Sequence, residues 1–455
     1  MHAHSGGRAV SVSALAITLV AAATSAAGRP VSLPEAEDIA LQRNPAISLA
    51  SDSLARAYAG VVGARARLLP SVSLNGSYTH NFESPVFFFP GDSGAPSRAV
   101  KVGQANQYAF GLSAAQPLFL GFAGITGYRM AETQVRTAEI GQDDATQRVI
   151  EGVREAYLGA VLMRKLVDVQ REAVAQAESS LVQTRRRFDV GTVSRFDLLR
   201  AQVQLATTRP NLLSAIGKQE LADAQLRQAM GLGGTETVEP ADTLAEFASP
   251  WLQANLDSLV QLAYRNRPDM RQVGYLDEMA RYGVRLARSA YLPTLAIGAQ
   301  SQWQASRPEV MVRPHDFVRS ISGGLQLSWN IWNSFGTAAA VQQANVGVRQ
   351  VASVTRLVQN ATALQVESAY RQLQDAAARL TSGQETVGQA AEALRIARVM
   401  YAAGGNTQLD VTNAQLLLTQ AQTQYVSALY DYHVANTRME RALGLVRPSQ
   451  QRRSR

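Results

Sequence analysis

The chain has 455 residues, contains no cysteine and carries a formal net charge of +8. Without cysteine it can form neither disulfides nor thiolate-ligated metal sites. Arg8 and four arginines after residue 446 account for five of the positive charges, which leaves a body of net charge +3 and argues against a nucleic-acid partner.

The first 27 residues have the layout of a secretory signal peptide. Arg8 is their only charge, an uncharged run of apolar and small polar residues follows, and the small residues of "TSAAG" suit a cleavage site near Ala26 or Ala27. The apolar run is too short to anchor the chain in a bilayer, and no later segment approaches 18 uninterrupted apolar residues. We therefore expect residues 1–27 to be removed from an exported protein.

The rest of the chain repeats one unit twice. The segment "LPEAEDIALQRNP" (33–45) matches "LDSLVQLAYRNRP" (256–268), and further along Gly191 corresponds to Gly404 and Asp197 to Asp410. Such internal similarity predicts a duplicated fold. We expect repeat 1 over residues 28–232, a linker over 233–250, repeat 2 over 251–446 and a basic tail over 447–455.

Two segments of each repeat alternate apolar and polar residues, as strands with one apolar face do. We expect four strands, at about 71–83, 106–118, 294–304 and 319–330, and strands of about ten residues cross a membrane when they are tilted. The polar face carries Ser, Thr, Asn and Gln rather than Lys and Glu, which favours a water-filled lumen. The opposite face would contact lipid through Tyr78, Phe110, Leu295, Leu325 and Trp329.

Two soluble hairpins with one buried face are the alternative interpretation of these strands. Four strands cannot close a barrel, so a membrane barrel would need strands from other chains. Trp329 and Trp332 either form part of an aromatic belt at the membrane boundary or pack against the start of the next helix.

Each repeat continues as a long helical hairpin, expected at about 121–231 and 335–444. Apolar residues recur every seven positions, which is typical of coiled-coil packing. They are Val153, Ala160, Val167, Val174 and Leu181 in repeat 1, and Val366, Leu373, Leu380, Val387, Leu394 and Tyr401 in repeat 2. The returning arm of each hairpin is shorter, so we expect the helix that precedes the strands, which ends at Leu69 or Leu292, to stack end-on and complete it.

Each hairpin turns at a glycine, Gly191 or Gly404. Ser194-x-x-Asp197 and Thr407-x-x-Asp410 follow these glycines and are typical of capping boxes, in which an acidic residue stabilises the first turn of a helix. Capping is therefore one sufficient explanation of both aspartates.

Catalytic and metal sites find little support in the sequence. The five histidines are far apart, no carboxylate lies near them at ligand spacing, and no glycine-rich phosphate loop occurs. Asp143 and Asp144 are interpreted as surface charges of a helix. We expect no enzymatic activity, no cofactor and no metal.

In this order and spacing, several short strings resemble the outer-membrane efflux protein family, the TolC-like channels of Gram-negative bacteria. They are "QPLFLGF" (116–122), "FDVGT" (188–192) with Asp197, and "ALGL" (442–445), within a tandem duplication that spans the mature chain. The resemblance implies a mixed α and β membrane channel: a homotrimer whose 12-stranded transmembrane β-barrel, with four strands per chain, continues as a long periplasmic α-helical barrel. It also implies an outer-membrane location, and a periplasmic adaptor and an inner-membrane pump as partners.

The resemblance also implies roles for the tips. It assigns a periplasmic gate to Asp410, Asp197, Tyr401, Asn413 and Asn406, with Asp410 on the inner hairpin and a hydrogen bond from Tyr401 to Asp197 on the neighbouring hairpin. Asn406 and Asn413 depart from the family pattern, because a basic and a second acidic residue are common at these two positions. Adaptor docking is expected at tip residues that surround the two glycine turns, namely Val190, Gly191, Thr192, Val193, Gly404 and Gly405.

The sequence therefore favours an outer-membrane exit duct for efflux or type I secretion. One alternative is a periplasmic coiled-coil adaptor, which would need one hairpin rather than two. The other is a structural or adhesive trimeric coiled coil without a pore, which gives no reason for four duplicated strands.

Overall fold

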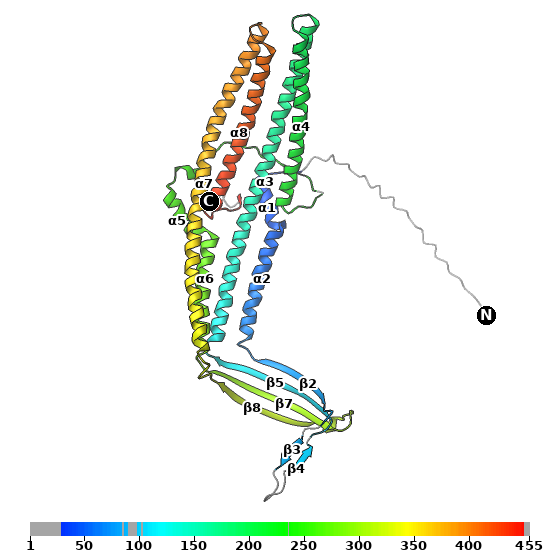
Figure 1. Ribbon diagram of the computed structural model, residues 1–455, viewed down its shortest axis with the longest axis vertical. Coiled ribbons are helices and arrows are strands. Elements are labelled where there is room, and N and C mark those ends of the chain that lie inside the picture. The colour runs from blue at the N-terminus through cyan, green and yellow to red at the C-terminus, as the bar shows by residue number, and fades with distance from the viewer. Residues whose placement is uncertain (1–28, 84–85, 90–97, 102, 235, 450–455) are drawn as a thin grey trace, which may run out of the picture.

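The computed structural model describes residues 29–83, 86–89, 98–101, 103–234 and 236–449. The molecule is elongated, with a curved sheet at one end and two long helical hairpins that reach the other end (Figure 1). The signal peptide expected over residues 1–27 lies outside the described residues, as do residues 450–455 of the expected basic tail. Among the described helices, none combines the length and the apolar character that a membrane-spanning helix needs.

The main elements follow the same order twice. Repeat 1 contains α1 (Leu33–Arg43), α2 (Pro45–Ala66), β2 (Ser71–His80), β5 (Asn106–Leu120), α3 (Ala123–Asp189) and α4 (Arg195–Ala229). Repeat 2 contains α5 (Leu256–Asn266), α6 (Pro268–Ser289), β7 (Thr294–Arg307), β8 (Val318–Ser328), α7 (Gly336–Ala402) and α8 (Gln408–Ala442). A short 3-10 helix, η2 (Pro250–Gln253), precedes α5, and another, η3 (Pro314–Asp316), precedes β8.

The four long strands form one antiparallel sheet in the order β2-β5-β7-β8. Their ends differ from the expected ones by up to three residues, because alternation predicts a strand but not where its pairing stops. The register of β5 against β7 shifts between Pro117 and Phe119, and proline, which lacks an N–H, is tolerated at such an irregularity. A separate small hairpin, β3 (Val86–Phe89) with β4 (Arg98–Lys101), extends the loop between β2 and β5 and was not expected.

The long arms α3 and α7 contain 67 residues each, while the returning arms α4 and α8 contain 35. At 1.5 Å per residue, a long arm measures about 100 Å. The seven-residue repeat faces the hairpin partner, since Val153, Ala160 and Val167 of α3 and Val366 and Leu373 of α7 are fully buried. Coiled-coil-like packing thus supplies the hydrophobic contacts along both hairpins.

The shorter arms are completed end-on, as expected. The side-chain amide of Asn44, just before α2, donates to the carbonyl of Ala229 at the end of α4 at 2.8 Å. The guanidinium of Arg267, just before α6, donates to the carbonyl of Ala442 at the end of α8 at 3.2 Å. Both bonds satisfy a carbonyl that a helix C-terminus leaves without an intrahelical partner. Different side chains therefore perform the same task in the two repeats.

The segment between the repeats is tied to both of them. Its strand β6 (Val238–Pro240) pairs in parallel with β1 (Arg29–Val31). The hydroxyl of Tyr157 on α3 bonds to Asp242 at 2.8 Å, and the hydroxyl of Tyr432 on α8 donates to the carbonyl of Phe247 at 2.9 Å. Leu244 packs against the hydrophobic cores of both repeats. Residues 236–250 of the expected linker thus form a strap across the middle of the molecule.

Candidate functional site

The sheet has one apolar face on which four of the expected lipid-facing residues lie together. Tyr78 lies opposite Tyr108, Phe110 opposite Trp303, Leu295 opposite Leu327, and Leu325 opposite Ile297. Directly opposed residues point to the same side of a sheet, and this register carries that side across all four strands. Tyr78, Phe110, Leu295 and Leu325 therefore share one face of the sheet.

The other face of the sheet is polar and uncharged. Ser73 and Ser113 bring their hydroxyl oxygens to 2.7 Å, and Gln300 lies opposite both Ser113 and Ser322. None of the residues on this face in β2, β5, β7 and β8 is Asp, Glu, Lys or Arg. A face of hydroxyls and amides suits contact with water, but not with a hydrophobic core.

Aromatic rings cluster at the two ends of the apolar face. Away from the helices, Tyr78 and Tyr108 are 4.8 Å apart between ring centroids, and Phe110 stacks on Trp303 at 5.1 Å. At the strand-to-helix junctions both repeats use the same pair of positions, which lie three residues apart. Phe119 packs on Phe122 at 5.2 Å in repeat 1, and Trp332 on Phe335 at 5.0 Å in repeat 2. The apolar face is thus bounded by aromatic residues at both ends.

Trp329 belongs to the junction rather than to the sheet, which corrects its expected place on a strand. Strand β8 ends at Ser328, and the indole N–H of Trp329 donates to the carbonyl of Tyr291 at 3.1 Å. Its side chain is still more than half exposed. The indole N–H of Trp329 is therefore held just after the end of α6 while much of the residue remains at the surface.

The tips of the two hairpins have the same backbone turn. Gly191 and Gly404 adopt φ angles of 76° and 83°, which glycine reaches without the steric cost of a side chain. In both turns an N–H bonds back across the helix end, from Thr192 to the carbonyl of Arg187 and from Gly405 to that of Met400. Nothing from the rest of the described chain covers these turns, and Val190, Gly191, Thr192, Gly404 and Gly405 are all exposed, whereas Val193 is half-buried.

The two tip aspartates cap their own helices, so the capping interpretation is confirmed. Asp197 accepts from the hydroxyl of Ser194 at 2.6 Å and from its backbone N–H at 3.2 Å. Asp410 accepts from the hydroxyl of Thr407 at 2.7 Å and from its backbone N–H at 2.8 Å. The hydrogen bonds from Thr407 lower the pKa of Asp410. Asp410 therefore remains ionised at a lower pH than an ordinary aspartate.

Tyr401 does not make the expected hydrogen bond to Asp197 within the chain. Its hydroxyl oxygen is buried and has no hydrogen-bond partner among the described residues. The guanidinium of Arg187 lies over the Tyr401 ring, 4.4 Å from its centroid, and donates to the Tyr401 carbonyl at 3.4 Å. Within the chain, Ser194 holds Asp197 and Arg187 covers the Tyr401 ring, so a bond from Tyr401 to Asp197 of an adjoining copy stays a prediction.

Further contacts join the tips of the two repeats, and sequence reasoning missed them. The side-chain amide of Gln408, which is only 5% exposed, donates to the Ser180 hydroxyl at 2.6 Å, and Arg398 bonds to Gln176. Gln176, Ser180 and Arg187 thus form the α3 side of a polar contact strip, which faces α7 and α8. Only a run of polar residues at helical spacing on α3 could have indicated it.

The remaining gate residues are Asn413 and Asn406, neither of which takes part in the contacts of this strip. Asn413 lines a groove of about 850 Å³ that α3, α4 and α8 surround with Gln, Thr and Asn side chains. Asn406 is half-buried, and its side chain forms no hydrogen bond among the described residues. Within the chain, the structure therefore brings Arg187 and Tyr401 together, while Asp410 and Asn413 lie three residues apart on α8 and Asp197 lies in the first turn of α4.

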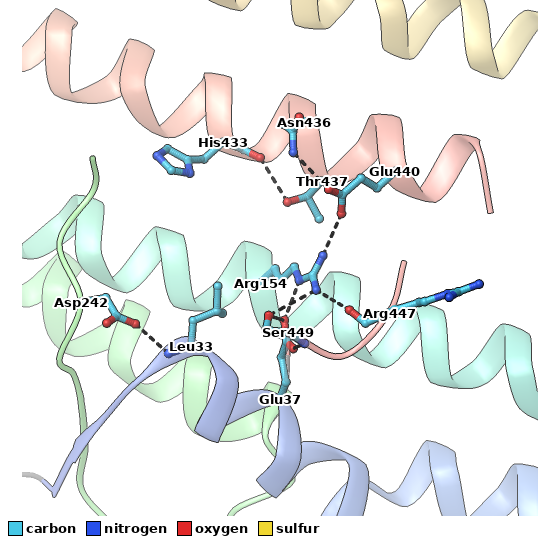
Figure 2. A network of polar contacts seen from close by, with 10 residues as sticks. All are labelled: Leu33, Glu37, Arg154, Asp242, His433, Asn436, Thr437, Glu440, Arg447 and Ser449. Atoms are coloured by element: carbon cyan, nitrogen blue, oxygen red, sulfur yellow. Dashed lines mark hydrogen bonds and ion pairs between the residues drawn. The ribbon is translucent and has the colours of Figure 1, made fainter. Parts of the chain in front are cut away.

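A buried ion network at the middle of the molecule was also missed. Arg154 of α3 donates to Glu37 of α1 at 2.6 Å and to Glu440 of α8 at 2.9 Å, and it also bonds to the carbonyl of Arg447 (Figure 2). Ser449 donates its backbone N–H to Glu37 at 2.6 Å. One guanidinium thus joins both repeats and the segment after α8.

Asp143 is an exposed surface charge of α3, as interpreted, whereas Asp144 is half-buried, and both form ion pairs between the repeats. Asp144 of α3 pairs with Arg441 of α8 at 2.6 Å, and Asp143 pairs with Arg271 of α6 at 2.9 Å. Among the described residues, no group of three or more His, Cys, Asp or Glu side chains could hold a metal ion. The ion pairs of Asp143 and Asp144 join α3 to α6 and α8.

A model of the family described as outer membrane efflux protein matches residues 37–232 and 259–445, that is, the two repeats without the segment between them. The alkaline protease secretion protein AprF of Pseudomonas aeruginosa is 25% identical over 342 residues, which cover 75% of this chain and 70% of AprF. The outer membrane protein TolC of Escherichia coli is 23% identical over 414 residues, covering 88% of this chain and 80% of TolC. The crystal structure of the Campylobacter jejuni CmeC outer membrane channel superimposes with a TM-score of 0.74 at 18% identity, covering 93% of this chain and 88% of CmeC.

Proposed function

The chain belongs to the outer membrane efflux protein family, and we propose that it is the outer-membrane exit duct of a tripartite efflux or type I secretion system. In this role it passively conducts cargo to the exterior from an inner-membrane pump and a periplasmic adaptor, and it performs no catalytic step. The carrying observation is that a sheet with one apolar and one uncharged polar face continues directly into helical hairpins about 100 Å long. The sheet has the faces needed in a membrane, and the hairpins are long enough to extend far from it toward a partner.

Three copies would complete the membrane part. The outer strands β2 and β8 each have one neighbour in the sheet, so each chain offers two strand edges. Unpaired backbone groups are too costly in lipid, and a closed ring of three sheets, with four strands from each chain, removes every edge. In such a barrel Tyr78, Phe110, Leu295 and Leu325 face lipid, Trp329 lies near the boundary, and the Ser and Gln face lines the lumen.

The same closure applies to the helices. Within the chain, α3 packs against α2 and α4 of repeat 1 and against α6 and α8 of repeat 2. The helix α7 has its main contacts with α5, α6 and α8 only, and α4 packs mainly on α3. Adjoining copies would therefore meet with α7 beside α2 and α4, which continues the order of helices found inside one chain.

The exposed tips supply a docking surface for the adaptor. Val190, Thr192 and the glycine turns lie at the end of the molecule farthest from the sheet, and Val190 is 73% exposed. Apolar side chains and accessible backbone at the end of a hairpin suit contact with another helical hairpin. This placement supports a periplasmic adaptor as partner, between the duct and its pump.

Conductance tests the proposed function. Purified chain reconstituted into planar bilayers should form stable pores, and the pore-forming species should have the mass of three chains. A periplasmic adaptor or an adhesive coiled coil should form none, so stable trimers that never conduct would contradict the proposal. Affinity capture of the chain from its host membranes should retain the adaptor and the pump.

Removal of the Arg187 side chain should favour the open duct. Arg187→Ala eliminates the cation–π contact with Tyr401, worth about 0.5–2 kcal/mol, so channel openings in single-channel recordings should become more frequent. Tyr401→Phe is the matched control, because it keeps the ring under the guanidinium and removes only a hydroxyl that has no partner among the described residues. If Tyr401→Phe opens the channel and Arg187→Ala does not, the closing contact is the hydroxyl of Tyr401 after all.

Asp410 should make the duct selective for cations. Three copies of Asp410 would form one acidic ring, with the uncharged Asn413 one turn further on. Asp410→Asn removes the charge and leaves an acceptor for Thr407, so the reversal potential in a KCl gradient should move toward zero. Because the hydrogen bonds from Thr407 lower the pKa of Asp410, the carboxylate keeps its charge as the pH falls, and selectivity should persist to a lower pH than an ordinary aspartate would allow. Unchanged selectivity in Asp410→Asn would leave this aspartate with its capping role alone.

A further inference from the structure

The contact between the two repeats inside one chain has opposite charges at its centre. This internal seam is formed by α3 on one side and by α6 and α8 on the other. Arg154 of α3 meets Glu440 of α8 at 2.9 Å, and both side chains are at least nine-tenths buried. Figure 2 shows the pair at the point where α3 and α8 come together.

The duplicated position of Arg154 carries the opposite charge. The repeats correspond at an offset of 213 residues, as from Gly191 to Gly404. Val153 and Tyr157 then match Val366 and Tyr370, and both valines are fully buried in their hairpins. The position between them is Arg154 in repeat 1 and Glu367 in repeat 2.

The duplicated position of Glu440 is also reversed. At the same offset Ala229 matches Ala442 and Gly231 matches Gly444, both at the ends of the shorter arms. Glu440 then corresponds to Arg227 of α4. The two positions of the internal ion pair therefore occur a second time in the sequence, with their charges exchanged.

Within one chain the exchanged pair is not formed. Glu367 lies on α7 and Arg227 on α4, and these helices have no major contact with each other. Glu367 is half exposed, and its one ion pair with a described residue is with Arg371, one turn along its own helix, at 3.8 Å. The guanidinium of Arg227 is partly exposed and has no ion-pair partner within the part of the chain that the structure describes.

From this we propose that Glu367 of one copy pairs with Arg227 of the next, in a copy–copy seam that repeats the internal seam with reversed polarity. The inference rests on the proposed trimer. Since α7 is the duplicate of α3 and α4 is the duplicate of α8, a ring that continues the internal arrangement sets α7 beside α4 of the adjoining copy. The occupant of this edge is thus a second copy of the chain.

The reversed polarity also selects the order of repeats around the ring. A contact between two copies of repeat 1 would set Arg154 against Arg227, and one between two copies of repeat 2 would set Glu367 against Glu440. Both would bring like charges together in a desolvated contact, which disfavours them. Only strict alternation of repeat 1 and repeat 2 pairs opposite charges at every seam.

The positions around the exchanged pair fit the same partner. On the internal seam Asp144 and Glu151 pair with Arg441, and Glu155 pairs with Arg438. The duplicates of these residues are uncharged: Leu357, Leu364 and Ser368 on α7, and Gln228 and Gln225 on α4. Leu357 and Leu364 are each 67% exposed in the single chain. A second copy would bury these leucines. At the copy–copy seam, apolar contact would thus take the place of the outer ion pairs of the internal seam, and Glu367–Arg227 would be the charge pair that remains.

Charge reversal tests the pair. Glu367→Arg and Arg227→Glu each create like charges at the copy–copy seam, so each should lose trimers in detergent at a temperature at which the unaltered trimer persists. The double variant restores opposite charges and should recover the trimer. Light scattering after graded heating measures the fraction of trimer. Arg371→Gln, which removes the in-helix partner of Glu367, should leave the trimer intact.

Mixing the two single variants gives a sharper result. When they are co-produced with different tags, the arginine introduced by Glu367→Arg in one chain can meet the glutamate introduced by Arg227→Glu in the other, which is a favourable contact. The contact of the unaltered Glu367 with the unaltered Arg227 is favourable too. A mixed ring then contains one like-charge seam instead of three. Trimers that carry both tags should therefore be enriched above the random proportion.

The outcomes separate this inference from the proposed function. If the unaltered chain is not a trimer, the proposed duct fails. If the unaltered trimer forms but the single reversals are harmless, or the double variant is no better than the single ones, only the exchanged pair is refuted. If Arg371→Gln loses as much trimer as the single reversals do, the effect lies in α7 itself, and the proposed Glu367–Arg227 pair is refuted.

Discussion

Arg154→Ala should lower the free energy of unfolding by about 3–5 kcal/mol, which is the usual result of removing one partner from a buried ion pair. The guanidinium is the cation between Glu37 and Glu440, whose side chains are 0% and 7% exposed. Its loss leaves two carboxylates buried close together and also frees the carbonyl of Arg447. The midpoint of thermal unfolding, followed by circular dichroism in detergent, should fall accordingly.

The matched control is Arg438→Ala. Arg438 pairs with Glu155 across the same two helices at 2.8 Å, but the two side chains are 52% and 31% exposed. Exposed pairs contribute about 0–1 kcal/mol, so this variant should unfold close to the unaltered protein. Arg154→Lys keeps the charge without the planar fork of donors, so its unfolding midpoint should lie between those of Arg154→Ala and Arg438→Ala. Equal stability of Arg154→Ala and Arg438→Ala would show that the network does not hold the repeats together.

Leu325→Arg should prevent assembly in the membrane, while Gln326→Arg should be tolerated. The two residues are neighbours on β8, and alternation sends their side chains to opposite faces of the sheet. Arginine on the lipid face costs about 2–4 kcal/mol near the midplane of the bilayer, whereas arginine in a lumen remains in water. Heat-resistant trimers in the outer-membrane fraction measure assembly.

A second pair of variants gives an independent check on two other strands, β5 and β2. Phe110→Arg lies on the apolar face and should also lose trimers, whereas Ser77→Arg lies on the polar face and should keep them with altered conductance. Equal tolerance of arginine on both faces would eliminate the barrel. Equal loss on both faces would instead indicate a sheet packed in a hydrophobic core on each side.

Local regularities in the sequence were sufficient to predict the long strands, the helical hairpins and the helix caps. Period-two alternation predicted all four long strands, because side chains of a strand point to opposite faces wherever the strand pairs. The seven-residue repeat predicted the hairpins and their buried seam, as the burial of Val153 and Val366 confirms. The duplication carried each prediction from one repeat to the other. The capping boxes at Ser194 and Thr407 are equally local, since three residues separate donor and acceptor.

Contacts between distant segments were beyond the reach of these regularities. Nothing near Arg154 in the sequence indicates that Glu37, Glu440 and Ser449 surround it, since these partners are 117, 286 and 295 residues away. The strap that bonds to Tyr157 and the pairing of β1 with β6 are of the same kind. Such contacts follow from which helix faces meet, and residue spacing within one helix does not determine that.

The hairpin tips contain both kinds of feature, those set by local sequence and those set by contacts between distant segments. The sequence by itself determined the glycine turns and the caps, because backbone geometry and hydrogen bonds to near neighbours decide them. Which residue lies over Tyr401 depends on how one hairpin packs against the other, and within the chain the tertiary structure places Arg187 there. The physical reason is that a cap closes within one helical turn, whereas a contact between hairpins depends on the packing of every residue along two arms about 100 Å long.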